Sequence, residues 1–298
     1  MMNIIQIPNN KKTAIAALLL AALLWSTAGL AFRLLTTIPN GLSISGYRSL
    51  FAALFYIIAF RSLPIMEKGK WFKLAIIAYT MATTLFVVAN TLTTAANAIV
   101  LQYTAPIFTC LFLFLLFKKP LPKYDIIATI IIFAGIFIFF VDSLTLQISP
   151  TMTFGNTIAV VSGVGFGLLA VVLGRTSTPC NAITFGNLLN VLIALPFMIM
   201  FPIGSLMDLI ILVCLGVVQI GIAYLLFTFA ASKVSPLELI LIPTLEPILN
   251  PIWVFLFDGQ APSLLSIFGG IIIICTILVW SLYKEKIKQK NKANTDKA

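Results

Sequence analysis

The stretch LELILIPTLEPILNPIW, residues 237–253, combines an apolar composition with groups that are costly in hydrocarbon. It carries two carboxylates, Glu238 and Glu246, and three prolines at four-residue spacing, Pro243, Pro247 and Pro251. A proline has no backbone N–H, so each one frees the carbonyl four residues earlier. Free carbonyls at membrane depth are tolerated where they are buried in protein or line a water-filled cavity. The stretch therefore favours either freed carbonyls that receive a substrate ammonium group or a kink that acts as a hinge, with a static packing kink as the alternative.

Glu246 lies about ten residues into a predicted span over 236–257, close to the middle of a bilayer. An ionised carboxylate there costs roughly 2.5–3.5 kcal/mol, so it must face a wet cavity, pair with a cation or be protonated. Helical spacing puts it on one stripe with Pro243, Asn250 and Trp253, a polar and aromatic surface suited to a binding wall. The alternative is a structural group, paired with Arg48 or protonated and bonded to a neighbour.

Two arginines also fall within apolar runs. Arg48 lies about seven residues into the predicted span 42–60. It either pairs with Glu246 or binds a substrate carboxylate through its two-pronged guanidinium. Arg33 lies near the end of the first span and can extend to the membrane surface. Glu238 has a structural interpretation, because residues 235–238 (Ser-Pro-Leu-Glu) form a capping box at a helix start.

Other polar and aromatic side chains in the apolar runs are candidates for substrate contacts. They are Trp25, Ser26, Tyr79, Asn90, Gln102, Tyr103, Gln219 and Tyr224. The alternative for each is an interhelical hydrogen bond, worth about 0.6 kcal/mol on average. Pro106 is a further candidate helix break, in addition to Pro243, Pro247 and Pro251. Gly163 and Gly167 have GxxxG spacing, which predicts close helix approach.

Membrane helices must position these residues. The chain has 298 residues, of which 60% are hydrophobic and 9% charged, whereas soluble domains carry about a quarter charged residues. A membrane helix needs roughly 20 apolar residues, and ten runs qualify. They are 13–36, 42–60, 72–92, 95–117, 124–142, 153–174, 181–201, 206–231, 236–257 and 262–283. We therefore predict an all-α polytopic membrane protein with ten transmembrane helices.

The basic residues predict the orientation of these spans. With the N-terminus in the cytoplasm, 17 of the 19 lysines and arginines fall in cytoplasmic segments, and the other two lie within spans. We expect a multi-pass protein of the inner (plasma) membrane with both termini cytoplasmic. The net charge of +10 then reflects orientation and anionic lipid headgroups rather than nucleic-acid binding.

The chain resembles itself after a shift of about 141 residues. Residues 97–117 align with 238–258, and Pro106 falls on Pro247 without a gap. Each unit holds five helices, and an odd number makes the second unit enter the membrane from the opposite side, as in the inverted repeats of secondary transporters. The predicted units are 13–142 and 153–283, followed by a basic tail, 284–298, with chance likeness of apolar stretches as the alternative.

Four segments resemble the EamA family of the drug/metabolite transporter superfamily. They are LLWSTAGLAFR, YRSLFAALF, AIVLQYTAPIF and SPLELILIPTLEPILNPIWVFLFDGQAP. The resemblance implies a ten-helix permease with two five-helix repeats around a central cavity, moving small metabolites. The sequence departs from the family pattern at Gln260, which stands where an acid usually follows the glycine.

These features favour a secondary transporter, an exporter, of amino acids or related zwitterions, working by alternating access. Glu246 and the freed carbonyls would take the ammonium group and Arg48 the carboxylate. The alternative is a non-catalytic membrane assembly or lipid-carrier protein in which Glu246 is structural. An enzyme is disfavoured, because the chain has no histidine and no CxxC pair for zinc or haem. We expect no cofactor, a small-molecule substrate, contact with membrane lipid, protons as a candidate coupling ion, and a monomer or weak homodimer.

Overall fold

The computed structural model describes residues 10–118, 121–141, 149–258 and 263–295, and within these ranges the chain is helical with no strand. In chain order the elements are α1 (Lys11–Ser26), α2 (Ala28–Arg33), α3 (Gly41–Phe60), α4 (Lys70–Leu92), α5 (Ala95–Gln102), α6 (Ala105–Phe117), α7 (Lys123–Phe140), α8 (Pro150–Val172), η2 (Leu173–Arg175), α9 (Pro179–Met200), α10 (Leu206–Cys214), η3 (Leu215–Ile222), α11 (Ala223–Ala231), α12 (Pro236–Leu241), η4 (Ile242–Thr244), α13 (Leu245–Asp258) and α14 (Leu264–Thr295).

The helices occupy the ten predicted spans, so the all-α polytopic fold is confirmed. Within the described ranges, seven helical segments are long and apolar enough to cross a membrane. The other three predicted spans correspond to α1 with α2, to α7, and to α12 with α13, which are broken or include positions that the structure does not fully describe. The first helix was predicted as continuous, but it is interrupted at Thr27, whose hydroxyl donates back to the Leu24 carbonyl (2.7 Å).

Two helices are broken close to prolines. Residues 103 and 104 separate α5 from α6, and Pro106 lies in the first turn of α6. In the second half, the 3₁₀ turn η4 contains Pro243, and α13 begins two residues before Pro247. The edges of the two breaks superpose to within two residues under the 141-residue shift. Missing N–H groups and fixed φ angles explain why both helices stop and restart here.

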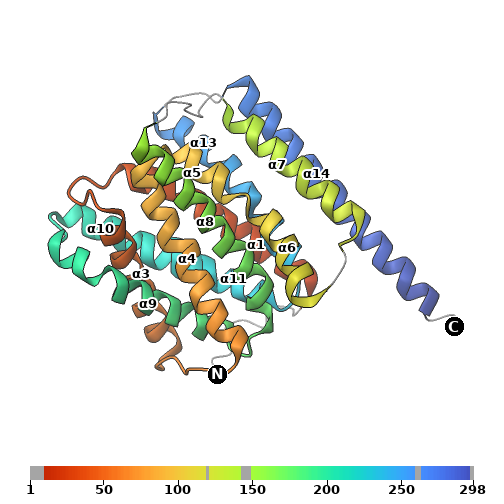
Figure 1. The fold of residues 1–298 in the computed structure, drawn as a ribbon, viewed down its shortest axis with the longest axis horizontal. Coiled ribbons are helices and arrows are strands. Elements are labelled where there is room, and N and C mark those ends of the chain that lie inside the picture. Colours follow the sequence, from red (N-terminus) through yellow and green to blue (C-terminus); the bar gives the residue numbers. More distant parts are fainter. Residues whose placement is uncertain (1–9, 119–120, 142–148, 259–262, 296–298) are drawn as a thin grey trace.

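Several of the helix pairs have a counterpart in the other half. α4 packs on α8 as α11 packs on α1, and α5 and α6 pack on α8 as η4 and α13 pack on α1. α4 also contacts α9, as η3 contacts α3. The remaining large contacts join α3 to α9 and α7 to α14, and the second pair lies side by side at one edge of the bundle (Figure 1).

The GxxxG spacing in α8 produces the predicted close helix contact. A Cβ added at Gly163 would lie 2.8 Å from the Gln102 carbonyl oxygen, and one at Gly167 would lie 2.6 Å from that of Ala105. Real side chains do not approach backbone atoms this closely. The two glycines therefore allow α8 to pack directly against the break between α5 and α6.

The predicted capping box at the start of α12 is formed. The Ser235 N–H donates to the Glu238 carboxylate (2.8 Å), and the Glu238 N–H donates to the Ser235 hydroxyl (3.3 Å). The same carboxylate accepts an ion pair from Lys11 of α1 at 2.6 Å and lies 3.8 Å from the Lys284 ammonium of α14. The beginnings of α1 and α12 and this part of α14 therefore lie at one end of the bundle, which we call the terminal end.

A neutral version of this arrangement stands at the opposite end. The Thr94 hydroxyl caps α5 by accepting the Asn97 N–H (3.1 Å), and the 141-residue shift maps these residues onto Ser235 and Glu238. The Asn97 amide donates to the Asn156 side-chain oxygen of α8 (3.4 Å). An amide therefore occupies the position that a carboxylate holds at the terminal end.

Candidate functional site

A small cavity lies where helices from both halves of the chain meet. Its volume is about 40 Å³, and it is lined by Trp25, Arg48, Ala82, Thr83, Phe86, Gln102, Phe166, Gln219, Tyr224 and Glu246. Six of these side chains are candidates that the sequence singled out: Trp25, Arg48, Gln102, Gln219, Tyr224 and Glu246. The fold thus brings together, from six helical segments, the buried Arg48, the half-buried Glu246 and four of the polar or aromatic candidates.

The break in the last proline-rich span positions Glu246. The Tyr103 hydroxyl lies 2.8 Å from the Glu246 carboxylate and 3.2 Å from the Pro243 carbonyl oxygen. That carbonyl is the one freed by Pro247. A phenol has only one proton, so Tyr103 can donate to only one of these two acceptors at a time. When Glu246 is ionised, its carboxylate accepts the hydrogen bond from the Tyr103 hydroxyl. When Glu246 is protonated, it can donate to the Tyr103 oxygen, and Tyr103 then donates to the Pro243 carbonyl oxygen.

Arg48 is buried and does not pair with Glu246. Its guanidinium donates to the Gln219 side-chain oxygen and lies 4.9 Å from the centre of the Phe32 ring. Among the described residues no ion pair joins Arg48 to Glu246, although both line the cavity, and the buried Nε of Arg48 has no hydrogen-bond partner. An unpaired buried N–H is costly, so an anionic group in this cavity would be stabilised here.

The residue that holds Arg48 lies in an irregular turn that the sequence did not predict. Gln219 lies in η3, a π-helical turn. Turns of this kind re-aim side chains and are frequent at functional sites. The turn packs closely on α3, since a Cβ at Gly216 would lie 2.6 Å from the Arg48 carbonyl oxygen.

Aromatic rings pack around the cavity towards the terminal end. The Tyr224 ring lies 5.0 Å from that of Trp25 and 4.8 Å from that of Tyr79, and Phe227 and Phe166 join the same group. The Tyr79 hydroxyl donates to the Asn187 side-chain oxygen of α9 (2.9 Å), outside the cavity. Tyr79 therefore positions the aromatic wall instead of lining the cavity.

Three other candidates make helix–helix or local contacts. Trp253 donates through its indole N–H to the Ser26 hydroxyl (2.8 Å), which joins α13 to α1. Asn90 donates to the Phe86 carbonyl of its own helix (2.8 Å). None of these three is among the residues that line the cavity. Gln102, which does line it, also donates to the Ser162 hydroxyl of α8 (2.7 Å).

Some predicted residues cannot be assigned a contact. The side chains of Arg33, Asn250 and Pro251, together with residue Gln260, lie outside the part of the chain that the structure describes. Five cavity or neighbouring residues were not singled out from the sequence: Phe32, Ala82, Thr83, Phe86 and Phe166. They are ordinary apolar or hydroxyl residues in apolar helices. Whether such a residue faces the cavity or packs against a neighbouring helix depends on the rotation of its helix about its axis, which the sequence does not give.

Comparison with known proteins agrees with this architecture. Residues 12–141 match the EamA-like transporter family. A solved crystal structure is similar with a TM-score of 0.75 at 20% sequence identity, over 93% of this chain and 99% of that chain, which is a likeness of fold. A search of curated proteins found no match. The first five predicted spans are therefore similar to the EamA-like transporter family, and the fold shared with the solved structure extends over most of the chain.

Proposed function

We propose that this protein is a secondary transporter that carries a small zwitterion, such as an amino acid, by alternating access. The family is one of membrane transporters rather than enzymes, which supports the transport function itself. The substrate class rests on one observation. Arg48 and Glu246, of opposite charge, line the same cavity with no ion pair between them.

Two opposite charges in a low-dielectric cavity attract each other strongly, and neither is stabilised by bulk water. Here each is held by a neutral partner instead, Arg48 by Gln219 and Glu246 by Tyr103. A ligand with a carboxylate and an ammonium group would satisfy both charges at once. A ligand with a single charge would leave one of them unsatisfied.

The described conformation is closed around this site. A cavity of about 40 Å³ holds about one water molecule, which is too small for an amino acid. Substrate access therefore requires the two halves of the bundle to move apart. The matched helix breaks, the matched caps at Thr94 and Ser235, and the helix contacts that recur in both halves support an inverted repeat, the architecture in which such rocking is common.

Protons are the proposed coupling ion. In this scheme the Tyr103 proton points to Glu246 when that carboxylate is ionised and to the Pro243 carbonyl when Glu246 is protonated. Protonation therefore changes a bond at the helix break itself. This links the charge of the site to the shape of the broken helix.

The remaining features follow from charge distribution and family resemblance. We propose export across the plasma membrane, one of the directions that the family resemblance implies. We place both termini in the cytoplasm, because 17 of the 19 basic residues then fall in cytoplasmic segments. The expected partners are the substrate, protons and membrane lipid, and the expected assembly is a monomer or weak homodimer.

The test begins with a thermal-shift screen of the purified protein against amino acids, other small zwitterions and singly charged analogues, followed by flux of the hits into vesicles. Glu246→Gln should retain the fold and reduce flux roughly 10- to 100-fold, because it removes a charged hydrogen-bonding group, and the residual flux should no longer depend on pH. Glu238→Gln is the matched control, since it changes the same group outside the cavity. Full, pH-dependent flux in Glu246→Gln would instead favour a structural carboxylate, as in an assembly or lipid-carrier protein.

A further inference from the structure

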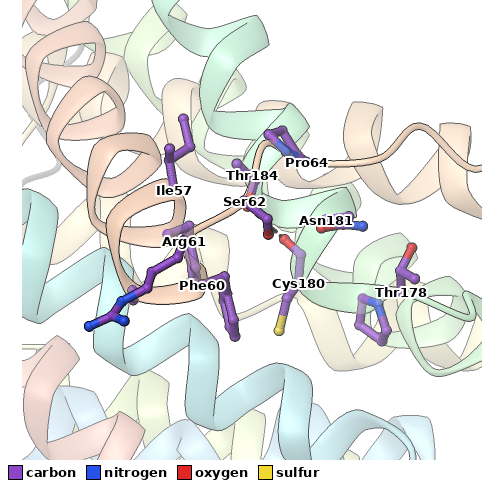
Figure 2. Close-up of a pocket in the computed structure, with 12 residues that line it drawn as sticks. Ile57, Phe60, Arg61, Ser62, Pro64, Thr178, Cys180, Asn181 and Thr184 are labelled. Atoms are coloured by element: carbon purple, nitrogen blue, oxygen red, sulfur yellow. Dashed lines mark hydrogen bonds between the residues drawn. The ribbon is translucent and has the colours of Figure 1, made fainter. Parts of the chain in front are cut away.

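A second, larger cavity lies at the terminal end, between the end of α3 and the start of α9 (Figure 2). Its volume is about 740 Å³, and its lining includes Phe60 and Ser62 on one wall and Thr178, Cys180 and Asn181 on the other. This space is large enough for an amino acid and carries hydroxyl, amide and aromatic groups. Neither the family match nor the central site explains it.

Tyr56 connects this cavity to the central one. Arg48, Ala52 and Tyr56 are buried on one face of α3, at i, i+4 and i+8, so Tyr56 lies about 12 Å from Arg48 along the helix. Tyr56 lines the larger cavity, and its hydroxyl donates to the Gly221 carbonyl (2.8 Å). Gly221 belongs to the same π-helical turn as Gln219, which lines the central cavity.

The contact between Tyr56 and Gly221 is close and specific. A Cβ at Gly221 would lie 2.6 Å from the Phe55 ring, so the turn approaches α3 closely. The Tyr56 ring also stacks on Phe60, with ring centres 6.2 Å apart. One side chain thus contacts both the larger cavity and the backbone turn that carries the Arg48 partner.

We infer that the larger cavity is the terminal-side vestibule of the transport route, where the same class of small polar zwitterion binds in transit, and that the hydrogen bond from Tyr56 to Gly221 closes the passage between vestibule and central site. This inference rests on the proposed function. When the bond breaks, the Tyr56 ring can turn away and the Gly221 carbonyl becomes available to an ammonium group on its way through.

The competing explanation is a groove filled by lipid. Exposed apolar side chains stand near the cavity, notably Ile58 at 72% and Leu63 at 75% exposure. A lipid-filled groove would exclude charged, water-soluble molecules, whereas a vestibule would admit them. The accessibility of one native residue separates these two cases.

Cys180 is the native reporter of this cavity. Its side chain is half-buried on the cavity wall and lies 3.2 Å from the Thr228 hydroxyl of α11. The other cysteines are replaced by alanine, and the protein is reconstituted in vesicles. A cationic, membrane-impermeant methanethiosulfonate is applied from either side. The matched control is a variant that retains only Cys275, an exposed residue in the middle of the apolar part of α14.

We expect Cys180 to react with the charged reagent from the terminal side, and Cys275 to react only with a membrane-soluble maleimide. Reaction of Cys180 with the maleimide alone would overturn the vestibule and favour the lipid groove. No transported substrate is needed for this readout, so a failure of the proposed function leaves it intact. After a substrate has been identified, adding it should slow the modification of Cys180 by the charged reagent. Equal modification rates with and without the substrate would contradict binding in the vestibule.

The role of Tyr56 is tested with Tyr56→Phe, which keeps the ring and removes only the hydrogen bond. The reporter is Thr83→Cys, a change of similar side-chain size in the central cavity, in a background without other cysteines. Loss of one hydrogen bond shifts an opening equilibrium by roughly two- to tenfold. The cysteine at position 83 should therefore react faster from the terminal side by that factor in Tyr56→Phe, with the rate from the opposite side unchanged. Equal terminal-side rates with and without the Tyr56 hydroxyl would overturn the gate.

Discussion

Arg48 of α3 and Glu246 of α13 line one cavity at the junction of the two halves of the chain, and no ion pair joins them. Gln219 accepts a hydrogen bond from the arginine, and Tyr103 bonds the glutamate. Because neither partner carries the opposite charge, both charged groups remain available to a ligand. This separation argues against a structural salt bridge between the two residues, and it is the basis of the proposed zwitterion site.

The Tyr103 hydroxyl should couple protonation to transport. Tyr103→Phe removes the proton shared between Glu246 and the Pro243 carbonyl while keeping the ring. We expect substrate still to equilibrate across vesicles, but the accumulation driven by a pH gradient to fall by roughly two- to tenfold, the range expected for one hydrogen bond. The measurement is accumulation against an imposed pH gradient.

Tyr79→Phe is the control for this substitution, since that hydroxyl is bonded to Asn187 outside the cavity. It should leave the coupling unchanged. If Tyr103→Phe accumulates substrate as the unmodified protein does, Tyr103 plays no part in coupling.

The contact between Gly167 and α6 should be sensitive to a single methyl group. Gly167→Ala would bring a Cβ to 2.6 Å from the Ala105 carbonyl and should destabilise the protein by about 1–3 kcal/mol, as overpacking does. Thermal unfolding in detergent measures this. Gly69→Ala is the control, because its nearest neighbour would be a flexible Glu67 oxygen at 3.3 Å. Equal melting temperatures for the two variants would contradict the close packing.

The elements and their breaks were largely predictable, and the contacts inside the site were not. Apolar runs predicted the ten spans, and prolines predicted the breaks near Pro106 and Pro243. The spans and the breaks could be predicted because each depends on local composition. The partner of Arg48 depends on how α3 and η3 are rotated against each other. The π-helical turn that carries Gln219 contains no proline, so no local sequence signal predicts it. Tertiary packing therefore decided that Arg48 meets Gln219 instead of Glu246.

The ion pair between Lys11 and Glu238 should stabilise the terminal end. Lys11→Met removes the positive charge and retains an apolar stem. We expect a loss of about 1 kcal/mol in unfolding free energy at low salt, decreasing at high salt because ions screen exposed charge. Lys12→Met, at the exposed neighbouring position, should change little. A stability loss that is the same at all salt concentrations would point to packing rather than charge.

The most direct test of a zwitterion held between Arg48 and Glu246 measures binding of three related ligands: an amino acid, its carboxamide and its des-amino acid. Titration calorimetry is carried out on the unmodified protein, Arg48→Gln and Glu246→Gln. Each charged hydrogen bond is worth about 1.5–3 kcal/mol, or roughly 10- to 100-fold in affinity. Arg48→Gln should weaken binding of the amino acid and the des-amino acid but leave the carboxamide unchanged, and Glu246→Gln should weaken the amino acid and the carboxamide but not the des-amino acid. If both substitutions weaken all three ligands equally, or neither weakens any, the two residues do not hold opposite ends of the substrate.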